Sequence, residues 1–112
     1  PHMNYINTTT IQQLTRGQSL HFLERMTGAA IVSDDNRNII RMAFSKLVGK
    51  AGSKFKTLEI QYNEATDLYD LHAFKLNRKT FQIETKKQLD GIYSDQLQEI
   101  CQDLTGLYFT LR

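Results

Sequence analysis

Apolar and polar residues alternate in several segments of the chain, which is the pattern of half-buried strands. Ile40, Met42 and Phe44 are separated by Arg41 and Ala43, a period of two that puts the apolar side chains on one face. Polar turns at 33–38 and 77–79 separate such segments. The strands predicted in this way are 29–32, 39–44, 58–62, 68–76 and 81–84.

A second pattern, with apolar residues three or four positions apart, predicts helices near both ends of the chain. Toward the C-terminus, Ser94 is a suitable N-cap and Gly106 a suitable stop. Near the N-terminus, 10–13 fits a capping box for a first helix, and Ser19 and Gly28 bracket a second short one. The apolar stripe of the C-terminal helix is Leu97, Ile100, Cys101 and Leu104.

These elements predict an α+β fold with an antiparallel sheet of about four to five strands. The N- and C-terminal helices are expected to pack on one face of that sheet. The last residues, 107–112, again alternate between apolar and polar side chains. The pattern leaves open whether they form a further paired strand.

Length and composition fit one globular domain. Residues 1–3 have the character of a cloning scar with Met3 as the native start, so we assign 4–112 to a single α+β domain. The hydrophobic share of 40% and the charged share of 23% are typical of globular chains. The single cysteine, Cys101, excludes an internal disulfide, and no apolar run approaches the ~18 residues of a membrane span. We therefore expect an intracellular protein.

Residues suited to catalysis or metal binding are scattered. His21, His72 and Cys101 fall on three predicted elements without metal-site spacing, so no metal and no cofactor are predicted. Asp67 and Asp70 point to opposite faces of a strand, which rules out a shared acid–base role. The glycine-rich stretch lacks the spacing of a phosphate loop. The chain is therefore predicted not to be an enzyme.

The charges are unevenly distributed although the net charge is only +2. The range 36–58 contains six basic residues and no acidic one, whereas nine acids and six bases follow from Glu59 onward. We expect a bipolar molecule. The basic loop is either a solvated connector or an anion-binding arm, in which Phe55 stacks on an unpaired base. The candidate residues for such a nucleic-acid site are Arg41, Lys46, Lys50, Lys54, Phe55 and Lys56.

A second candidate surface lies in the C-terminal part, where aromatic residues flank the predicted helix. These side chains either complete the core or, if the last segment is an edge strand, contact a protein partner or a second copy. Tyrosine is enriched at such interfaces. The candidate protein-contact residues are Tyr93, Tyr108, Phe109 and Leu111.

Three blocks of the sequence resemble a group of small uncharacterised proteins encoded by tailed phages and related mobile elements. The blocks are MTGA at 26–29, DLYDLHAFKLNR at 67–78 and GIYSDQLQEICQDLTGLYFTLR at 91–112. The resemblance implies an origin and a shared fold. It implies no activity and no functional residues, and the lysine-rich segment lies between the blocks.

Two functional hypotheses follow. In the first, a non-enzymatic phage or mobile-element accessory protein acts by protein–protein contact, as an adaptor or inhibitor of a host or defence component. In the alternative, the protein binds nucleic acid through the basic Arg41–Lys56 segment. The first ranks ahead because that segment lacks a recognised reading element. Either role predicts a cytoplasmic protein of a bacterial host, with no membrane partner; self-association is a further option.

Overall fold

The computed structural model describes residues 3–45 and 54–111 of the chain. Lys46 and Lys50 therefore lie outside the described residues. The elements follow one another as α1 (Tyr5–Thr15), α2 (Leu20–Thr27), β1 (Ala30–Asp34), β2 (Ile39–Ala43), β3 (Thr57–Asn63), β4 (Leu68–Leu76), β5 (Ile83–Ile92) and α3 (Ser94–Thr105).

The strands form one antiparallel five-stranded sheet in the order β1-β2-β3-β4-β5. Each strand pairs with its neighbour in sequence. The register aligns Ile40 with Ile60 and Ile60 with Leu71, so the alternating apolar residues form rows on one face of the sheet. The predicted α+β fold with about four to five antiparallel strands is confirmed.

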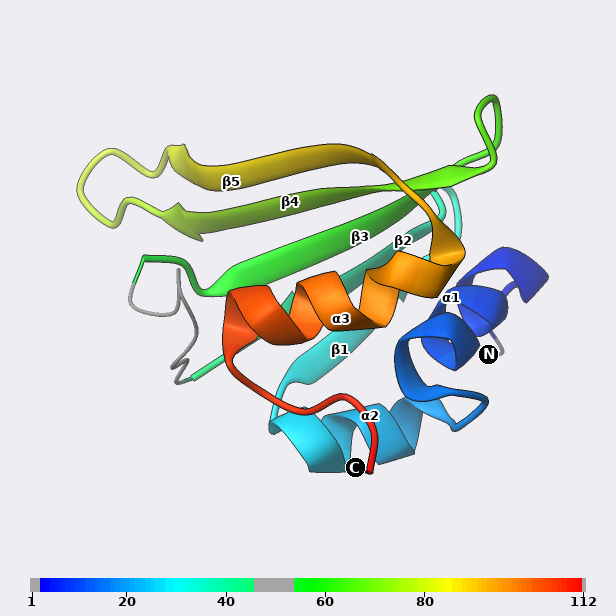
Figure 1. Cartoon of the computed structure of the whole chain (residues 1–112). Helices are drawn as coiled ribbons and strands as arrows, with labels where there is room; N and C mark the ends of the chain where they lie inside the picture. Colours follow the sequence, from blue (N-terminus) through cyan, green and yellow to red (C-terminus); the bar gives the residue numbers. More distant parts are fainter. Residues whose placement is uncertain (1–2, 46–53, 112) are drawn as a thin grey trace.

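All three helices lie against the same face of the sheet (Figure 1). The apolar rows of the sheet share one buried cluster with Ile11 of α1, Leu23 of α2, and Leu97 and Cys101 of α3. Removing these side chains from water is the main force that holds the helices in place. Burial also raises the pKa of the Cys101 thiol, which therefore stays protonated and acts as an apolar side chain.

The N-cap of the first helix lies six residues earlier than predicted. The Asn4 side chain accepts the backbone N–H of Asn7 at 2.7 Å, and this cap starts α1 at Tyr5. Thr10 instead lies buried inside the helix, where its hydroxyl donates to the Ile6 carbonyl at 3.1 Å. The prediction of a start at Thr10 was wrong because a threonine hydroxyl can also bond within a helix.

The ends of the other helices lie within one residue of the prediction. Ser19 caps α2, and Gly28 ends it in the left-handed conformation with φ of 71°. At α3, Ser94 is the first helical residue, Tyr93 is the N-cap, and Gly106 ends the helix. In the described part of the chain, no helix combines the length and the apolar character that crossing a bilayer requires.

The C-terminal residues 107–111 are not a strand. Phe109 is fully buried, and its N–H donates to Gln102 Oε1 at 2.8 Å. The hydroxyl of Thr110 donates to the carbonyl of Thr15 at 3.2 Å, which ties the segment to the end of α1. The apolar alternation of this segment therefore reflects one buried anchor and not a sheet edge.

The fifth strand is longer and begins later than predicted. It spans Ile83–Ile92 instead of 81–84, and Phe81 lies in the turn before it with φ of 58°. Most residues of β5 are exposed because it is an edge strand. Polar residues are accepted on both of its faces, so the apolar alternation that marks the other strands is missing.

Candidate nucleic-acid interface

The two ends of the sheet carry opposite charge. In this topology the end of β2, the start of β3 and the β4–β5 hairpin lie at one end of the sheet, and the β1–β2 and β3–β4 turns lie at the other (Figure 1). The described cations at the first end, called here the basic end, are Lys54, Lys56, Lys75, Arg78 and Lys79. The acids at the second, acidic end are Asp34, Asp35, Glu64 and Asp67, and Arg37 at this end is paired with Asp34 at 2.9 Å.

A groove of about 940 Å³ crosses the basic end, and we call it the basic groove. Its lining comes from the end of β2, the start of β3 and the β4–β5 hairpin. The backbone ties these parts together, since Lys56 N–H donates to the Phe74 carbonyl at 3.0 Å and Phe44 N–H donates to the Lys56 carbonyl at 2.8 Å. The charged residues of the lining are Lys56, Lys75, Arg78, Lys79 and Glu84.

The acid in this lining is already compensated. Glu84 Oε2 accepts a hydrogen bond from Asn77 at 2.6 Å, and Glu84 Oε1 lies 3.2 Å from Lys86 Nζ. The bond from Asn77 and the neighbouring lysine lower the pKa of Glu84. The basic groove therefore contains three exposed cations and the half-buried Lys75, with a carboxylate whose charge is largely balanced by its own partners.

A neighbouring groove of about 760 Å³ between β5 and α3 is more evenly charged. Lys54, Lys86 and Lys87 line one side, and Glu99 and Asp103 line the other. Its mixed charge makes it a weaker site for a polyanion than the basic groove.

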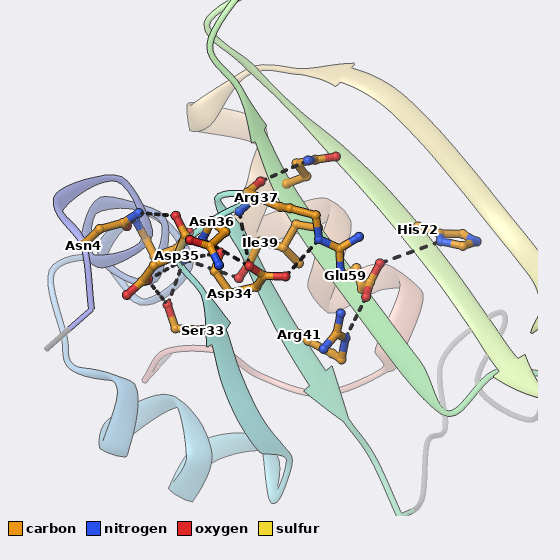
Figure 2. A network of polar contacts seen from close by, with 12 residues as sticks. Asn4, Ser33, Asp34, Asp35, Asn36, Arg37, Ile39, Arg41, Glu59 and His72 are labelled. Carbon is orange, nitrogen blue, oxygen red and sulfur yellow. Dashed lines mark hydrogen bonds and ion pairs between the residues drawn. The ribbon is translucent and has the colours of Figure 1, made fainter. Parts of the chain in front are cut away.

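The predicted anion-binding residues have different positions in the structure. Lys54 and Lys56 are exposed at the basic end. Phe55 between them is 1% exposed and belongs to the core, so the prediction that it stacks on a base was wrong. Arg41 lies in the middle of the sheet, where its Nε is 2.7 Å from Glu59 Oε2 (Figure 2). Its charge is paired with that carboxylate.

The predicted protein-contact residues do not form one surface. Tyr93, Tyr108 and Leu111 are exposed, but Phe109 is buried and cannot contact a partner, which corrects that part of the prediction. Tyr93 precedes the twelve-residue α3 and Tyr108 follows it. At 1.5 Å per residue the helix separates the two by about 18 Å.

Arg41 and Glu59 continue into a polar row across the open face of the sheet. His72 Nε2 lies 2.7 Å from Thr85 Oγ1, and His72 Nδ1 lies 4.0 Å from Glu59 Oε1. The order hydroxyl, imidazole, carboxylate is that of a nucleophilic triad. The carboxylate, however, is beyond hydrogen-bond distance of the imidazole and is held by Arg41. Cross-strand pairing is the role that this geometry fits.

The acidic end contains a cavity of about 380 Å³ beside α1 and the β3–β4 turn. Tyr62, Tyr69, Glu64 and Asp67 contribute to its lining. Tyr62 donates its hydroxyl to Asp67, and this bond raises the pKa of Tyr62 to about 12. Two carboxylates at its mouth repel phosphate, so this cavity is unsuited to the ligand that the basic groove fits.

The turn Asn77–Gln82 is the part of the site that sequence reasoning missed. The sequence predicts a turn at 77–79 but assigns no role to Arg78 and Lys79. They lie within two residues of Asn77 in sequence, and in space they join Lys56, which is about twenty positions away. Only the pairing of β3 with β4 shows that the two basic segments meet.

No protein-family model, curated protein or solved structure matches the chain. The resemblance to phage-encoded proteins therefore stays a prediction. Within residues 3–45 and 54–111, no three His, Cys, Asp or Glu side chains are grouped as metal ligands would be.

Proposed function

We propose that the protein binds nucleic acid through the basic groove. The observation that carries this proposal is the convergence of Lys56, Lys75, Arg78 and Lys79 on one groove from two parts of the chain, the start of β3 and the β4–β5 hairpin. Clustered Lys and Arg side chains bind phosphates and release the counterions condensed around them. A groove also concentrates the electrostatic potential more than a flat surface does.

The number of cations sets the expected salt dependence. Four phosphate contacts to a single strand give a slope of log K against log salt of about −2.8. Affinity then falls by about 50-fold between roughly 50 and 200 mM salt. Fluorescence-anisotropy titration of labelled oligonucleotides at the two salt concentrations measures this slope.

A pair of charge reversals tests the site itself. Arg78→Glu with Lys79→Glu removes two phosphate contacts, so binding is expected to weaken and the slope to shrink by about 1.4 for a single strand. Arg16→Glu with Arg25→Glu makes the same change in net charge at exposed positions of the helical layer, and it serves as the control. Equal losses in both double variants would mean that net charge and not the groove binds the ligand.

Protein–protein contact, which the sequence ranked first, keeps one observation in its favour. The ten-residue β5 pairs with β4 alone among the described strands, and most of its residues are exposed. An edge of this kind can pair with a strand of another protein, as an adaptor or inhibitor would. Binding to such a partner is expected to survive Arg78→Glu with Lys79→Glu, whereas nucleic-acid binding is not. Sedimentation velocity at rising concentration tests the version in which the partner is a second copy.

A further inference from the structure

The three turns at the strand ends share one geometry. Each begins with an Asp or Asn whose side chain accepts the backbone N–H two residues later: Asp34 from Asn36 at 3.1 Å, Asn63 from Ala65 at 3.0 Å, and Asn77 from Lys79 at 2.9 Å. In each turn the residue four positions after the first is left-handed. These residues are Asn38, Asp67 and Phe81, with φ of 55°, 57° and 58°.

Phe81 is the unexpected residue at this position. Asn and Asp tolerate the left-handed conformation because their short polar side chains bond locally, whereas a bulky residue there is an outlier. Burial does not compensate for the strain, because 78% of Phe81 is exposed. The requirements of the fold therefore favour Asn, Asp or Gly at position 81, and the presence of Phe needs another explanation.

The surroundings of Phe81 indicate what it contacts. Arg78 and Lys79 belong to the same turn and line the basic groove. Leu76 and Ile83, which pair with each other across the hairpin, are 52% and 58% exposed. The tip therefore combines an unburied ring, two exposed aliphatic side chains and cations. A ligand that matches this combination has a phosphate, which the cations bind, next to a flat apolar ring, which packs on Phe81.

We propose that Phe81 is a stacking platform for an unpaired base, and that the ligand of the basic groove is single-stranded nucleic acid. This inference rests on the proposed function of the groove. Base–aromatic stacking tolerates any sequence because every base has a π-face. In a duplex the bases are stacked on each other, so Phe81 adds affinity for single strands and not for duplexes.

The variant Phe81→Asn tests the proposal without endangering the fold. It places at position 81 the residue that the β1–β2 turn has at Asn38, so the thermal midpoint is expected to stay equal or rise. Anisotropy titration with a single strand of about 16 nucleotides is expected to show a loss of about 5- to 150-fold, the range of one base–aromatic stack. Affinity for the matching duplex is expected to stay unchanged. Tyr5→Asn is the control, since Tyr5 is 84% exposed on α1 near the acidic end.

A second variant gives a readout that does not depend on affinity. The chain has no tryptophan, so Phe81→Trp introduces a single tryptophan at the turn, whose emission can be excited separately from that of the tyrosines. Stacking on a base is expected to quench its emission on titration with the single strand, and to leave the emission unchanged with duplex. Unquenched emission while the strand is bound would overturn the stacking role.

The outcomes separate this inference from the function on which it rests. If Phe81→Asn leaves single-strand affinity unchanged while the Arg78 and Lys79 reversals abolish it, the stacking role is overturned and the groove stands. If the wild-type protein binds no oligonucleotide at the lower salt, both proposals fail. If Phe81→Asn abolishes binding to phosphatidylserine vesicles but not to the single strand, the tip inserts into anionic membranes, and the stacking role is again overturned.

Discussion

At the scale of single residues, Asn7 organises the acidic end of the molecule. Its side chain is fully buried, and its Nδ2 lies 2.8 Å from Ser33 Oγ and 3.2 Å from Asp35 Oδ1. The carbonyl oxygens of Asp34 and Ile39 lie 3.2 and 3.3 Å from the same nitrogen. One amide therefore holds the β1–β2 turn against α1. Its own Oδ1 is buried without a partner in the described structure.

The variant Asn7→Asp is expected to show how much the amide matters. A carboxylate at position 7 would face the carboxylate of Asp35 and the same carbonyls, with no hydrogen to donate. Burying a carboxylate with no donor or cation beside it costs about 3 kcal/mol of unfolding free energy at pH 7. The pKa of the new carboxyl is raised in the folded state, so the loss shrinks as pH falls toward about 4. Urea unfolding at both pH values measures it; an equal loss at both would contradict the account.

At the basic end, Phe81 is the single residue on which the proposed stacking role depends. Local rules alone would place Asn, Asp or Gly at its position, as in the two related turns. In these two turns an Asn or Asp begins the turn, and a second Asn or Asp stands four positions later at the left-handed residue. This spacing of two Asn or Asp residues is visible in the sequence at Asp34 and Asn63. The same spacing is absent at 77–81, where Phe81 replaces the second Asn or Asp, so the sequence pattern does not identify this third turn.

At the scale of elements, the strands and helices that bury one face were the predictable ones. Because the sheet is covered on one side, apolar residues recur at every second position in β2 and β3. In the C-terminal helix they recur at every third or fourth position, because one side of the helix is buried. The start of α1 was misassigned because two capping signals compete there. The length of β5 was underestimated, and the state of the tail was left open, because exposure of an edge and burial of Phe109 are set by tertiary contacts.

The C-terminal tail gives the sharpest test at this scale. Phe109→Ala removes a fully buried ring and is expected to cost about 3 to 5 kcal/mol. Leu111→Ala, two residues later, changes a side chain that is 69% exposed and is expected to cost less than about 0.5 kcal/mol. Chemical denaturation of the two variants makes the comparison. Similar small losses in both would mean that the tail does not close the core.

The β1–β2 turn carries a pH-dependent part of the stability. The hydrogen bond from Arg37 holds the pKa of Asp34 below its ordinary value, and the bond from Ser33 does the same for Asp35. A lowered pKa in the folded state means that the contribution is present above about pH 4 and is lost as pH falls through the lowered values. Asp34→Asn is therefore expected to lose less stability than wild type between pH 5 and about pH 2.5.

That comparison isolates the carboxylate. At the acid limit Asp34 is protonated, so wild type and variant carry the same net charge and the same general repulsion. Unfolding free energies that fall in parallel across the range would show that Asp34 makes no such contribution.

At the scale of the whole molecule, the up-and-down order of the strands places acidic residues at one end of the sheet and basic residues at the other. The β1–β2 and β3–β4 turns lie at one end of the sheet and the β4–β5 hairpin lies at the other (Figure 1). The first two turns contain acids of the acidic end, and the hairpin contains Arg78 and Lys79 of the basic end. The sequence predicted a bipolar molecule from its charge blocks. It could not predict that Arg78 and Lys79 of the later block join the basic end, because this depends on the pairing of β3 with β4.

The proposal that nucleic acid binds in the basic groove is tested by mapping where the ligand contacts the folded chain. In a titration of ¹⁵N-labelled protein with a single-stranded oligonucleotide at roughly 50 mM salt, the chemical shifts of the backbone amides are followed together. If the basic groove is the binding site, the shifts are concentrated at 54–56 and at 75–83, and the amides of Tyr5, Glu64 and Tyr93 do not move. Shifts concentrated at the acidic end or along the C-terminal tail, or no shifts at all, would contradict it.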